Sequence, residues 1–257
     1  MRLAGQVAFV TGGGAGIGRG CSIALARDGA DVAVNDIRID AATAVAAEVE
    51  ALGRRALAFT ASAADRAALE QGLTAAERTL GPVSIVVANI AAGVRKPFVD
   101  LSEEDVRSVL AATVWAVFHA LQAAARRMLE RRQPGSLVVI SSVHATMPFK
   151  HAAPYNAAKA AVNALARTVA NELAPDRIRV NVVEPGWIDT PGQRRHSTEE
   201  QLRVGGSRLP LGRLGNIDDI GRAVAYLVSE EAAYITGSIL RVDGGFSLPR
   251  PEIFPNT

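Results

Sequence analysis

The segment VAFVTGGGAGIGRG, residues 7–20, joins a short apolar run to a glycine-rich turn and then to a helical pattern. Glycines at positions 12, 16 and 18 let the backbone turn tightly and come close to a bound diphosphate. The free amide groups at the start of the following helix would face that anion. A strand, a glycine turn and a helix in this order predict the first unit of a dinucleotide-binding α/β fold.

The rest of the chain repeats this alternation of short apolar runs with longer, alanine-rich stretches of helical period. Strands are expected at residues 7–11, 31–35, 56–59, 84–88, 136–141, 179–184 and 239–242. Helices are expected at residues 16–28, 40–52, 65–80, 106–131, 154–173 and 218–228. The strand runs are apolar throughout, as strands covered on both faces require. The pattern predicts an α/β, Rossmann-type, doubly wound parallel sheet of about seven strands with helices on both faces.

The 257 residues fit one domain that combines dinucleotide binding and catalysis, residues 1–257, because a single core can reach about this size. Residues 189–215 contain no convincing strand and are rich in Gly, Arg and Ser. We expect this stretch to form a lid over the substrate. Residues 249–257 contain three prolines and are expected to form a surface arm.

Composition excludes several other classes of protein. Hydrophobic residues make up 49% and charged residues 21%, which favours a packed core over disorder. The net charge of +2 comes from scattered Lys and Arg, so we expect no nucleic-acid partner. No signal peptide and no apolar run of about 18 residues is seen, which predicts a cytoplasmic protein without a membrane partner. Cys21 is expected to be buried, and four dispersed His residues predict no metal site.

Asp36 ends the second strand, 18 residues beyond Gly18. A carboxylate here would accept hydrogen bonds from the adenosine ribose and repel the 2′-phosphate of NADP, which favours NAD. Arg19 and Arg38 lie near in sequence, so NADP stays as the less favoured alternative. A solvated acid at a strand end is the other interpretation of Asp36.

Tyr155 and Lys159 lie four residues apart in a predicted helix, and therefore on one face of it. Tyrosine titrates near pH 10, so a base at neutral pH needs its pKa lowered by about 3 units, which an adjacent ammonium group can provide. Ser142 ends a strand whose carboxyl end would open into the same crevice. A surface pair on a helix is the simpler alternative, but the upstream glycine turn favours a reactive site.

These features resemble the short-chain dehydrogenase/reductase family from Leu3 to about Ser247. The matching segments are TGGGAGIG (11–18), ISS (140–142), YNAAK (155–159), RIRVNVVEPG (177–186), WIDTP (187–191), DIGRAVAYLVS (219–229), YITG (234–237) and VDGG (242–245). The resemblance implies an NAD(P)-dependent oxidoreductase that works as a homotetramer. It implies that Tyr155 is the general acid/base, that Lys159 lowers its pKa and binds the nicotinamide ribose, and that Ser142 orients the substrate. The implied cofactor contacts are Gly12, Gly14, Gly16, Ile17, Gly18, Asp36, Asn89, Tyr155, Lys159, Pro185, Gly186, Ile188 and Thr190.

Three positions depart from the family pattern. Thr113 stands where the family has the Asn of its catalytic proton relay, so the fourth catalytic position has a shorter side chain. The usual Asn-Asn-Ala-Gly is ANIA, residues 88–91, and the usual Asp near the adenine is Ser62. None of these departures removes Ser142, Tyr155 or Lys159, so activity with an altered relay is expected.

The segments that flank the site are similar to glucose-dehydrogenase-like and polyol dehydrogenases, which implies an aldose or polyol substrate. The expected substrate contacts are Ser142, His144, His151 and Trp187, with Asn89 and Gln193 also available. His144 and His151 could instead be polar loop residues. The alternatives are a sugar acid or a 3-oxoacyl thioester, recognised by the basic lid residues, or a catalytically inactive dinucleotide-binding regulator. Those lid residues are Arg194, Arg195, His196, Arg203 and Arg208.

Overall fold

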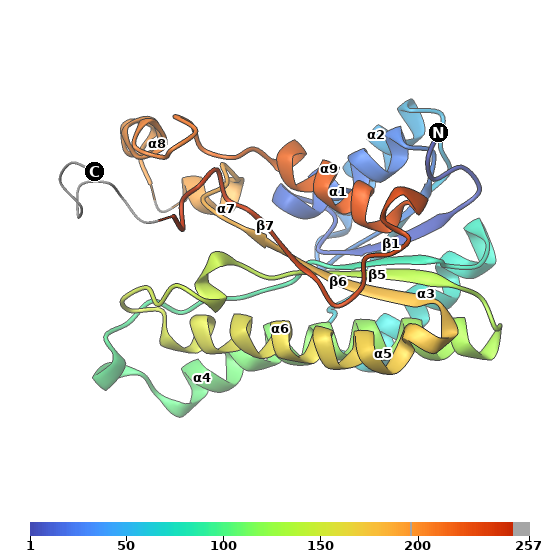
Figure 1. Cartoon of the computed structure of the whole chain (residues 1–257), viewed down its shortest axis with the longest axis horizontal. Helices are drawn as coiled ribbons and strands as arrows, with labels where there is room; N and C mark the ends of the chain where they lie inside the picture. The colour runs from blue at the N-terminus through green and yellow to red at the C-terminus, as the bar shows by residue number, and fades with distance from the viewer. Residues whose placement is uncertain (196, 249–257) are drawn as a thin grey trace.

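Seven parallel strands form one sheet in the order β3-β2-β1-β4-β5-β6-β7 (Figure 1). The computed structural model describes residues 1–195 and 197–248, so His196 and the expected arm at 249–257 lie outside the described residues. The strand order confirms the predicted doubly wound Rossmann-type sheet. The strands are β1 (Val7–Thr11), β2 (Asp31–Asp36), β3 (Ala56–Thr60), β4 (Ile85–Ala88), β5 (Gly135–Ile140), β6 (Ile178–Pro185) and β7 (Ile239–Val242).

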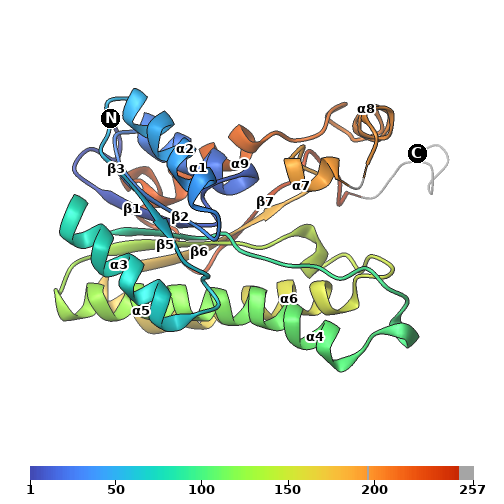
Figure 2. The ribbon, with the colours of Figure 1, turned by 180° about the vertical axis from the view of Figure 1, so that it is seen from behind.

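Helices cover both faces of the sheet, as predicted. One face carries α1, α2 and α9, and the opposite face carries α3, α5 and α6 (Figures 1 and 2). The helices are α1 (Gly16–Arg27), α2 (Ile39–Ala51), α3 (Arg66–Leu80), α4 (Glu103–Leu110), α5 (Ala116–Glu130), α6 (Ala153–Leu173), α7 (Pro191–Arg194), α8 (Glu199–Ser207) and α9 (Ile217–Val228).

The core consists of two apolar layers separated by the sheet. In β1, Phe9 packs into the layer under α3 and α5, while Ala8 and Val10 pack into the layer under α1 and α9. Successive side chains of a strand point to opposite faces, so a strand covered on both sides is apolar at every position. The edge strands β3 and β7 are only partly buried, because each has a neighbouring strand on one side alone.

The helix expected at residues 106–131 begins earlier and is interrupted. It starts at Glu103, because Ser102 and Asp105 form a reciprocal capping box. A π-helical turn, η2 (Ala111–Trp115), then separates α4 from α5. Residues 103–130 are long and apolar enough to cross a membrane by composition, but half of their most apolar window is buried, and α5 packs against β4. This stretch is a core helix.

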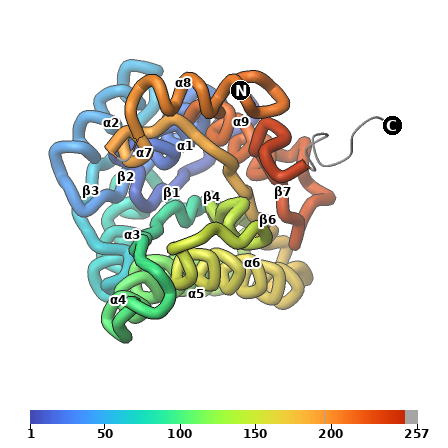
Figure 3. Tube along the Cα trace, turned by 90° about the vertical axis from the view of Figure 1, so that its left-hand side faces the viewer, coloured from blue at the N-terminus to red at the C-terminus, as the bar shows by residue number. Residues whose placement is uncertain are grey.

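The carboxyl ends of the strands meet at one end of the sheet, where α7 and α8 also lie (Figures 1 and 3). Both short helices fall within residues 189–215, and no described residue of this stretch belongs to one of the seven strands. Ile188 and Gly215 form an isolated parallel bridge at its base. The absence of a strand agrees with the sequence, and the role as a substrate lid stays a prediction.

Helix α1 crosses α9 with backbone almost in contact. A Cβ atom added at Gly221 would clash with the carbonyl oxygen of Gly20, and one at Gly20 would clash with the carbonyl oxygen of Ile217. Only glycine allows helices to approach this closely. Because α1 carries the glycine turn at its start, α9 fixes the direction of that turn.

We therefore expect Gly221→Ala to lower the free energy of unfolding by about 1–3 kcal/mol through overpacking. This corresponds to a fall in Tm of roughly 2–4 °C per kcal/mol for a chain of this size, measured by thermal unfolding. Gly192→Ala is the matched control, because its new Cβ would have Thr190 Oγ1 as nearest neighbour, at 3.8 Å. Equal Tm values for Gly221→Ala and the wild type would contradict the close crossing.

Candidate active site

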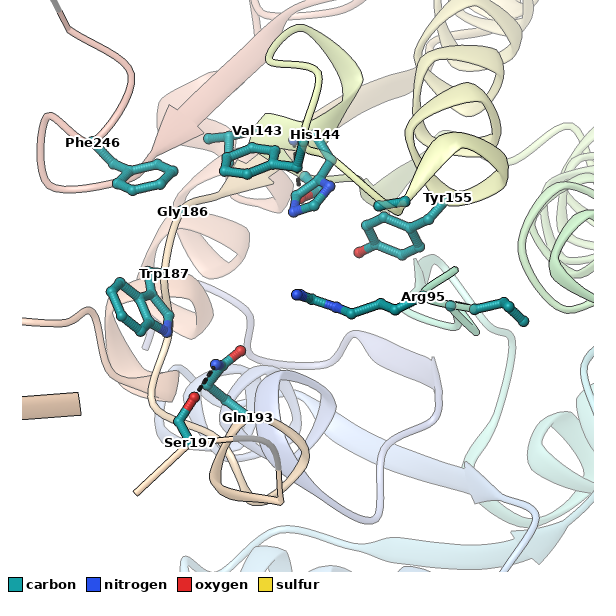
Figure 4. A pocket seen from close by; sticks show the side chains of 14 residues that line it. Arg95, Val143, His144, Tyr155, Gly186, Trp187, Gln193, Ser197 and Phe246 are labelled. Atoms are coloured by element: carbon teal, nitrogen blue, oxygen red, sulfur yellow. Dashed lines mark hydrogen bonds between the residues drawn. The ribbon is translucent and has the colours of Figure 1, made fainter. Parts of the chain in front are cut away.

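A pocket of about 490 Å³ opens beside the carboxyl ends of β5 and β6 (Figure 4). Its walls come from the loop after β4, the 3-10 turn η3 (Val143–Ala145), the start of α6 and the segment that leads into α7. The described lining residues are Gly93, Val94, Arg95, Ser142, Val143, His144, Phe149, Ala152, Tyr155, Gly186, Trp187, Gln193, Ser197 and Phe246. The structure thus brings Ser142, Tyr155, His144 and Trp187 to one cavity.

Tyr155 and Lys159 occupy successive turns of α6, which begins with Pro154 near its N-terminus. Lys159 Nζ lies 5.6 Å from the centroid of the Tyr155 ring and donates a hydrogen bond of 2.8 Å to the carbonyl oxygen of Ile140. Burial lowers the pKa of Lys159 to about 7, because a charged ammonium group loses its hydration there. In the free chain this lysine is therefore only partly charged at neutral pH.

Tyr155 is half-buried at the wall of the pocket. Burial raises its pKa above the ordinary value, whereas the Ser142 hydroxyl and the positive charge of Arg95 act in the opposite direction. The sequence directed attention to Lys159 as the group that lowers this pKa. The structure adds Arg95, which no motif had indicated, as a cation close enough to affect the phenol.

Ser142 lies directly after β5 and its Oγ accepts a hydrogen bond of 3.2 Å from the backbone amide of His144. The hydroxyl is therefore positioned by the first turn of η3. Because its amide partner uses the oxygen as an acceptor, the hydroxyl hydrogen stays available for donation toward the pocket.

The His144 ring has a defined tautomer. Asn156 donates through Nδ2 to the carbonyl oxygen of Phe149 at 3.1 Å, so its Oδ1 faces His144 Nδ1 at 2.7 Å. Nδ1 must then carry the proton, and Nε2 is left as an acceptor. Burial lowers the pKa of His144, against the Asn156 hydrogen bond, and the charges of Arg95 and Lys159 add to that lowering. The imidazole is neutral at pH 7 and stacks on Phe149, with ring centroids 4.1 Å apart.

The glycine turn between β1 and α1 fits a dinucleotide. A Cβ at Gly18 would clash with the carbonyl oxygen of Gly12, so the two ends of the turn touch through backbone alone. Asn89 Nδ2 donates to the same Gly12 oxygen at 3.2 Å, which holds the turn against the end of β4. The amide of Gly14 donates to Asp36 Oδ2 at 3.1 Å, and Asp36 is almost completely buried. The glycine turn leaves its backbone amides accessible to a diphosphate but has no room for a side chain at Gly18.

Other residues expected to contact the cofactor lie next to this turn or at the end of β6. A Cβ built at Gly16 would lie 3.6 Å from Thr190 Cβ, so α7, which Thr190 caps, begins next to the turn. Ile17 and the buried Ile188 belong to the same apolar layer. Pro185 ends β6, and the amide of Gly186 donates to Val242 at 3.0 Å.

Neither His151 nor Thr113 is among the described residues that line the pocket. His151 is exposed in a left-handed conformation with φ of 62°, and its carbonyl oxygen accepts from the Lys96 amide at 3.0 Å. His151 does not line the described pocket, and its contact with substrate stays a prediction. Thr113 is fully buried in the π-helical turn, and its Oγ1 accepts from the Ala92 amide at 3.4 Å. It supports the loop after β4 without lining the cavity.

Two of the basic lid residues, Arg194 and Arg203, are ion-paired with neighbouring acids. Arg194 forms ion pairs with Asp189 and Glu199, and Arg203 forms one with Glu200. Arg208 lies at a neighbouring hollow that it shares with Trp187. Recognition of an acidic substrate by Arg194 or Arg203, which the sequence left open, is thus not favoured.

Sequence reasoning missed Arg95, Phe149 and Phe246, which all line the cavity. The phenylalanine rings stack with centroids 5.8 Å apart and form an apolar wall. Arg95 could have been found, because it follows a strand whose carboxyl end faces the site. Phe246 could not, because its approach depends on how the chain turns after β7.

Comparison with known proteins adds independent evidence. A family model described as Enoyl-(Acyl carrier protein) reductase matches residues 12–247. The chain is 35% identical over 245 residues to L-rhamnose 1-dehydrogenase (NAD(P)(+)) of Sphingomonas sp. (strain SKA58), covering 95% of this chain and 96% of the relative. It is 32% identical to the 3-oxoacyl-[acyl-carrier-protein] reductase of Thermotoga maritima, covering 95% and 99%. It is 34% identical to D-erythrulose reductase of Gallus gallus, covering 96% and 97%.

Solved structures agree. A short-chain type dehydrogenase/reductase from Mycobacterium marinum superposes with a TM-score of 0.91 at 31% identity, covering 96% of this chain and 97% of that one. A 7α-hydroxysteroid dehydrogenase complexed with NADH and 7-oxo glycochenodeoxycholic acid superposes with a TM-score of 0.90 at 36% identity, covering 95% of each chain. This chain therefore belongs to the short-chain dehydrogenase/reductase family and is an NAD(P)-dependent oxidoreductase that acts on alcohol or carbonyl substrates.

Proposed function

We propose that this enzyme uses NAD to interconvert a secondary alcohol of a small polyhydroxylated compound, of the aldose, polyol or sugar-acid class, with its carbonyl form. The observation that carries the proposal is the shared cavity of Ser142, His144 and Tyr155 at the carboxyl ends of β5 and β6. One wall is apolar and the other offers several fixed polar atoms. A chain of vicinal hydroxyl groups suits such a cavity.

The chain's own residues would move the proton. In oxidation, the Tyr155 phenolate accepts the proton of the substrate hydroxyl, while the Ser142 hydroxyl donates a hydrogen bond to the same oxygen. Lys159 would hold the nicotinamide ribose through its hydroxyl groups and, when charged, would stabilise the phenolate. Bound NAD would supply the acceptor for the hydride of the carbinol carbon. The relay beyond Lys159 would differ from the family pattern, because Thr113 replaces an Asn.

Preference for NAD rests on the surroundings of Asp36. Its carboxylate lies beside the glycine turn and would repel a 2′-phosphate. Arg19, one of the two cations that could offset this charge, is held by both oxygens of Glu48, at 2.9 and 2.6 Å. Arg38 contributes its backbone amide to Asp36 Oδ1, at 3.1 Å.

Polar atoms around the cavity support a hydroxylated substrate. His144 Nε2 is an acceptor by its tautomer, and Trp187 Nε1 is a buried donor without a partner among the described residues. Gln193 is held to Ser197 at 2.9 Å and presents its amide from the lid side. Relatives named for L-rhamnose and D-erythrulose agree with this class.

A 3-oxoacyl thioester is the second candidate, because one relative is named for that reaction. The ion-paired lid arginines argue against it, since they leave less positive charge for a carrier phosphate. An inactive regulator is disfavoured by the retained Ser142, Tyr155 and Lys159. Assembly as a homotetramer in the cytoplasm completes the proposal, and light scattering after gel filtration tests the oligomer.

Replacing the proton-transfer residue tests the chemistry. We expect Tyr155→Phe to lower kcat by at least about 100-fold while NADH still binds, because only the proton-transfer group is lost. Turnover would be followed by NADH absorbance and binding by NADH fluorescence. Tyr226→Phe, on α9, is the matched control and should keep full activity. Retained turnover in Tyr155→Phe would refute the assignment.

Cofactor choice depends on one charge. We expect Asp36→Asn to lower the ratio of kcat/KM for NAD to that for NADP by at least about 10-fold, because a charged hydrogen-bond acceptor is lost and repulsion of the 2′-phosphate ends. Asp40→Asn, in the exposed first turn of α2, removes the same charge without touching the turn. A wild-type preference for NADP would overturn this part of the proposal.

Burial of Lys159 makes stability depend on pH. Its folded pKa of about 7 lies below the unfolded value near 10.5, so between these values the unfolded chain binds the extra proton and stability rises with pH. Relative to that of Lys159→Met, the free energy of unfolding of the wild type should rise by up to about 1.4 kcal/mol per pH unit from pH 7.5 to 9.5. Urea unfolding of both free proteins measures this difference.

The difference in free energy of unfolding between the wild type and Lys159→Met also includes the lost hydrogen bond to Ile140, which does not vary with pH. Only the change of this difference with pH therefore reports on the pKa of Lys159. If this difference stays constant from pH 7.5 to 9.5, Lys159 keeps its ordinary pKa in the folded chain.

A further inference from the structure

One cation, on an exposed loop, lines the cavity. Arg95, on the loop after β4, extends its side chain into the pocket, so that its guanidinium group faces Tyr155 and His144 (Figure 4). It is close enough to influence the titration of both rings. A group attached to a substrate that is held at Tyr155 would therefore come within reach of this charge.

No acid neutralises Arg95 among the residues that the structure describes. The lining of the cavity contains neither Asp nor Glu, and no carboxylate of the described chain lies within 4.0 Å of its guanidinium. Its neighbour Lys96 differs, because both oxygens of Asp105 accept from its Nζ, at 2.9 and 2.7 Å. Arg194 and Arg203, at the lid, are ion-paired too. Arg95 is thus a cation of the cavity lining that has no acidic partner among the described residues.

The chemistry of the guanidinium group favours a particular class of ligand. Its planar fork of N–H donors matches the two oxygens of a carboxylate, and hydrogen bonds between such charged partners are stronger than neutral ones. A single guanidinium balances one negative charge, which suits a carboxylate better than a phosphate monoester with nearly two. The neutral His144 supplies no second cation.

We propose that Arg95 determines substrate specificity by binding a carboxylate of the substrate, so that the enzyme oxidises a polyhydroxylated acid, such as an aldonic acid, and reduces its keto form. This inference rests on the proposed function and adds a charge to its substrate. In the oxidation, the carbinol C–H bond breaks and its hydride reduces NAD, while the O–H proton passes to Tyr155 and a C=O bond forms. The carboxylate is unchanged.

The wild type should oxidise aldonic acids with a kcat/KM at least about 10-fold above that for the aldose and alditol of equal length. Arg95→Gln should lower kcat/KM for the acid by roughly 10- to 100-fold, mainly through KM, and change the value for the neutral alditol by less than about twofold. Arg95→Lys should keep part of the preference. Lys96→Gln, which removes a charge from the same loop, should match the wild type.

Equal losses for acid and alditol in Arg95→Gln, or a shifted pH–rate profile with unchanged KM values, would overturn the inference, since Arg95 would then act on Tyr155 alone. A wild-type preference for sugar phosphates or neutral sugars would also overturn it and leave the proposed function standing. Turnover of a 3-oxoacyl thioester with none of any polyhydroxylated compound would instead overturn the proposed function itself.

Discussion

The site depends on the close approach of backbone to backbone within the glycine turn. Gly12 and Gly18 touch because neither has a Cβ, and this contact directs the start of α1 toward the end of β1. The approach continues on the other side of α1, where Gly20 and Gly221 allow α9 to cross it. The position of the anion-binding amides at the start of α1 therefore depends on these glycines, because a side chain at any of them would push the backbones apart.

A second constraint acts on charge. The parallel sheet brings the ends of β4, β5 and β6 to one crevice, and its apolar layers enclose the ionisable groups there. Burial moves the pKa of Lys159 down and that of Tyr155 up, so both groups are more neutral in the free chain than in water. The positive charge of Arg95 favours the phenolate form of Tyr155, and its side chain lines the same cavity.

Much of the site could be predicted, because it is encoded locally. The spacing of Tyr155 and Lys159 places both on one face of α6, and Ser142 follows a strand whose carboxyl end must open at the crevice. His144 and Trp187 were expected at the cavity and line it. His151 was expected there too and is absent from it, because the turn before α6 directs it to solvent. No periodicity specifies the direction of a residue in such a turn.

The sequence by itself determined the order of strands and helices, the parallel sheet, the glycine turn and the reactive pair, because period, spacing and backbone requirements are local properties of the chain. Only the tertiary structure decided the rest. The His144 tautomer depends on Asn156 and Phe149, and the charge at the cavity depends on which arginines find acids. The π-helical turn around Thr113, which packs against α6, was likewise not predicted. These features depend on which side chains meet once loops and turns have taken their folded shape, and the period and spacing of residues do not specify those contacts.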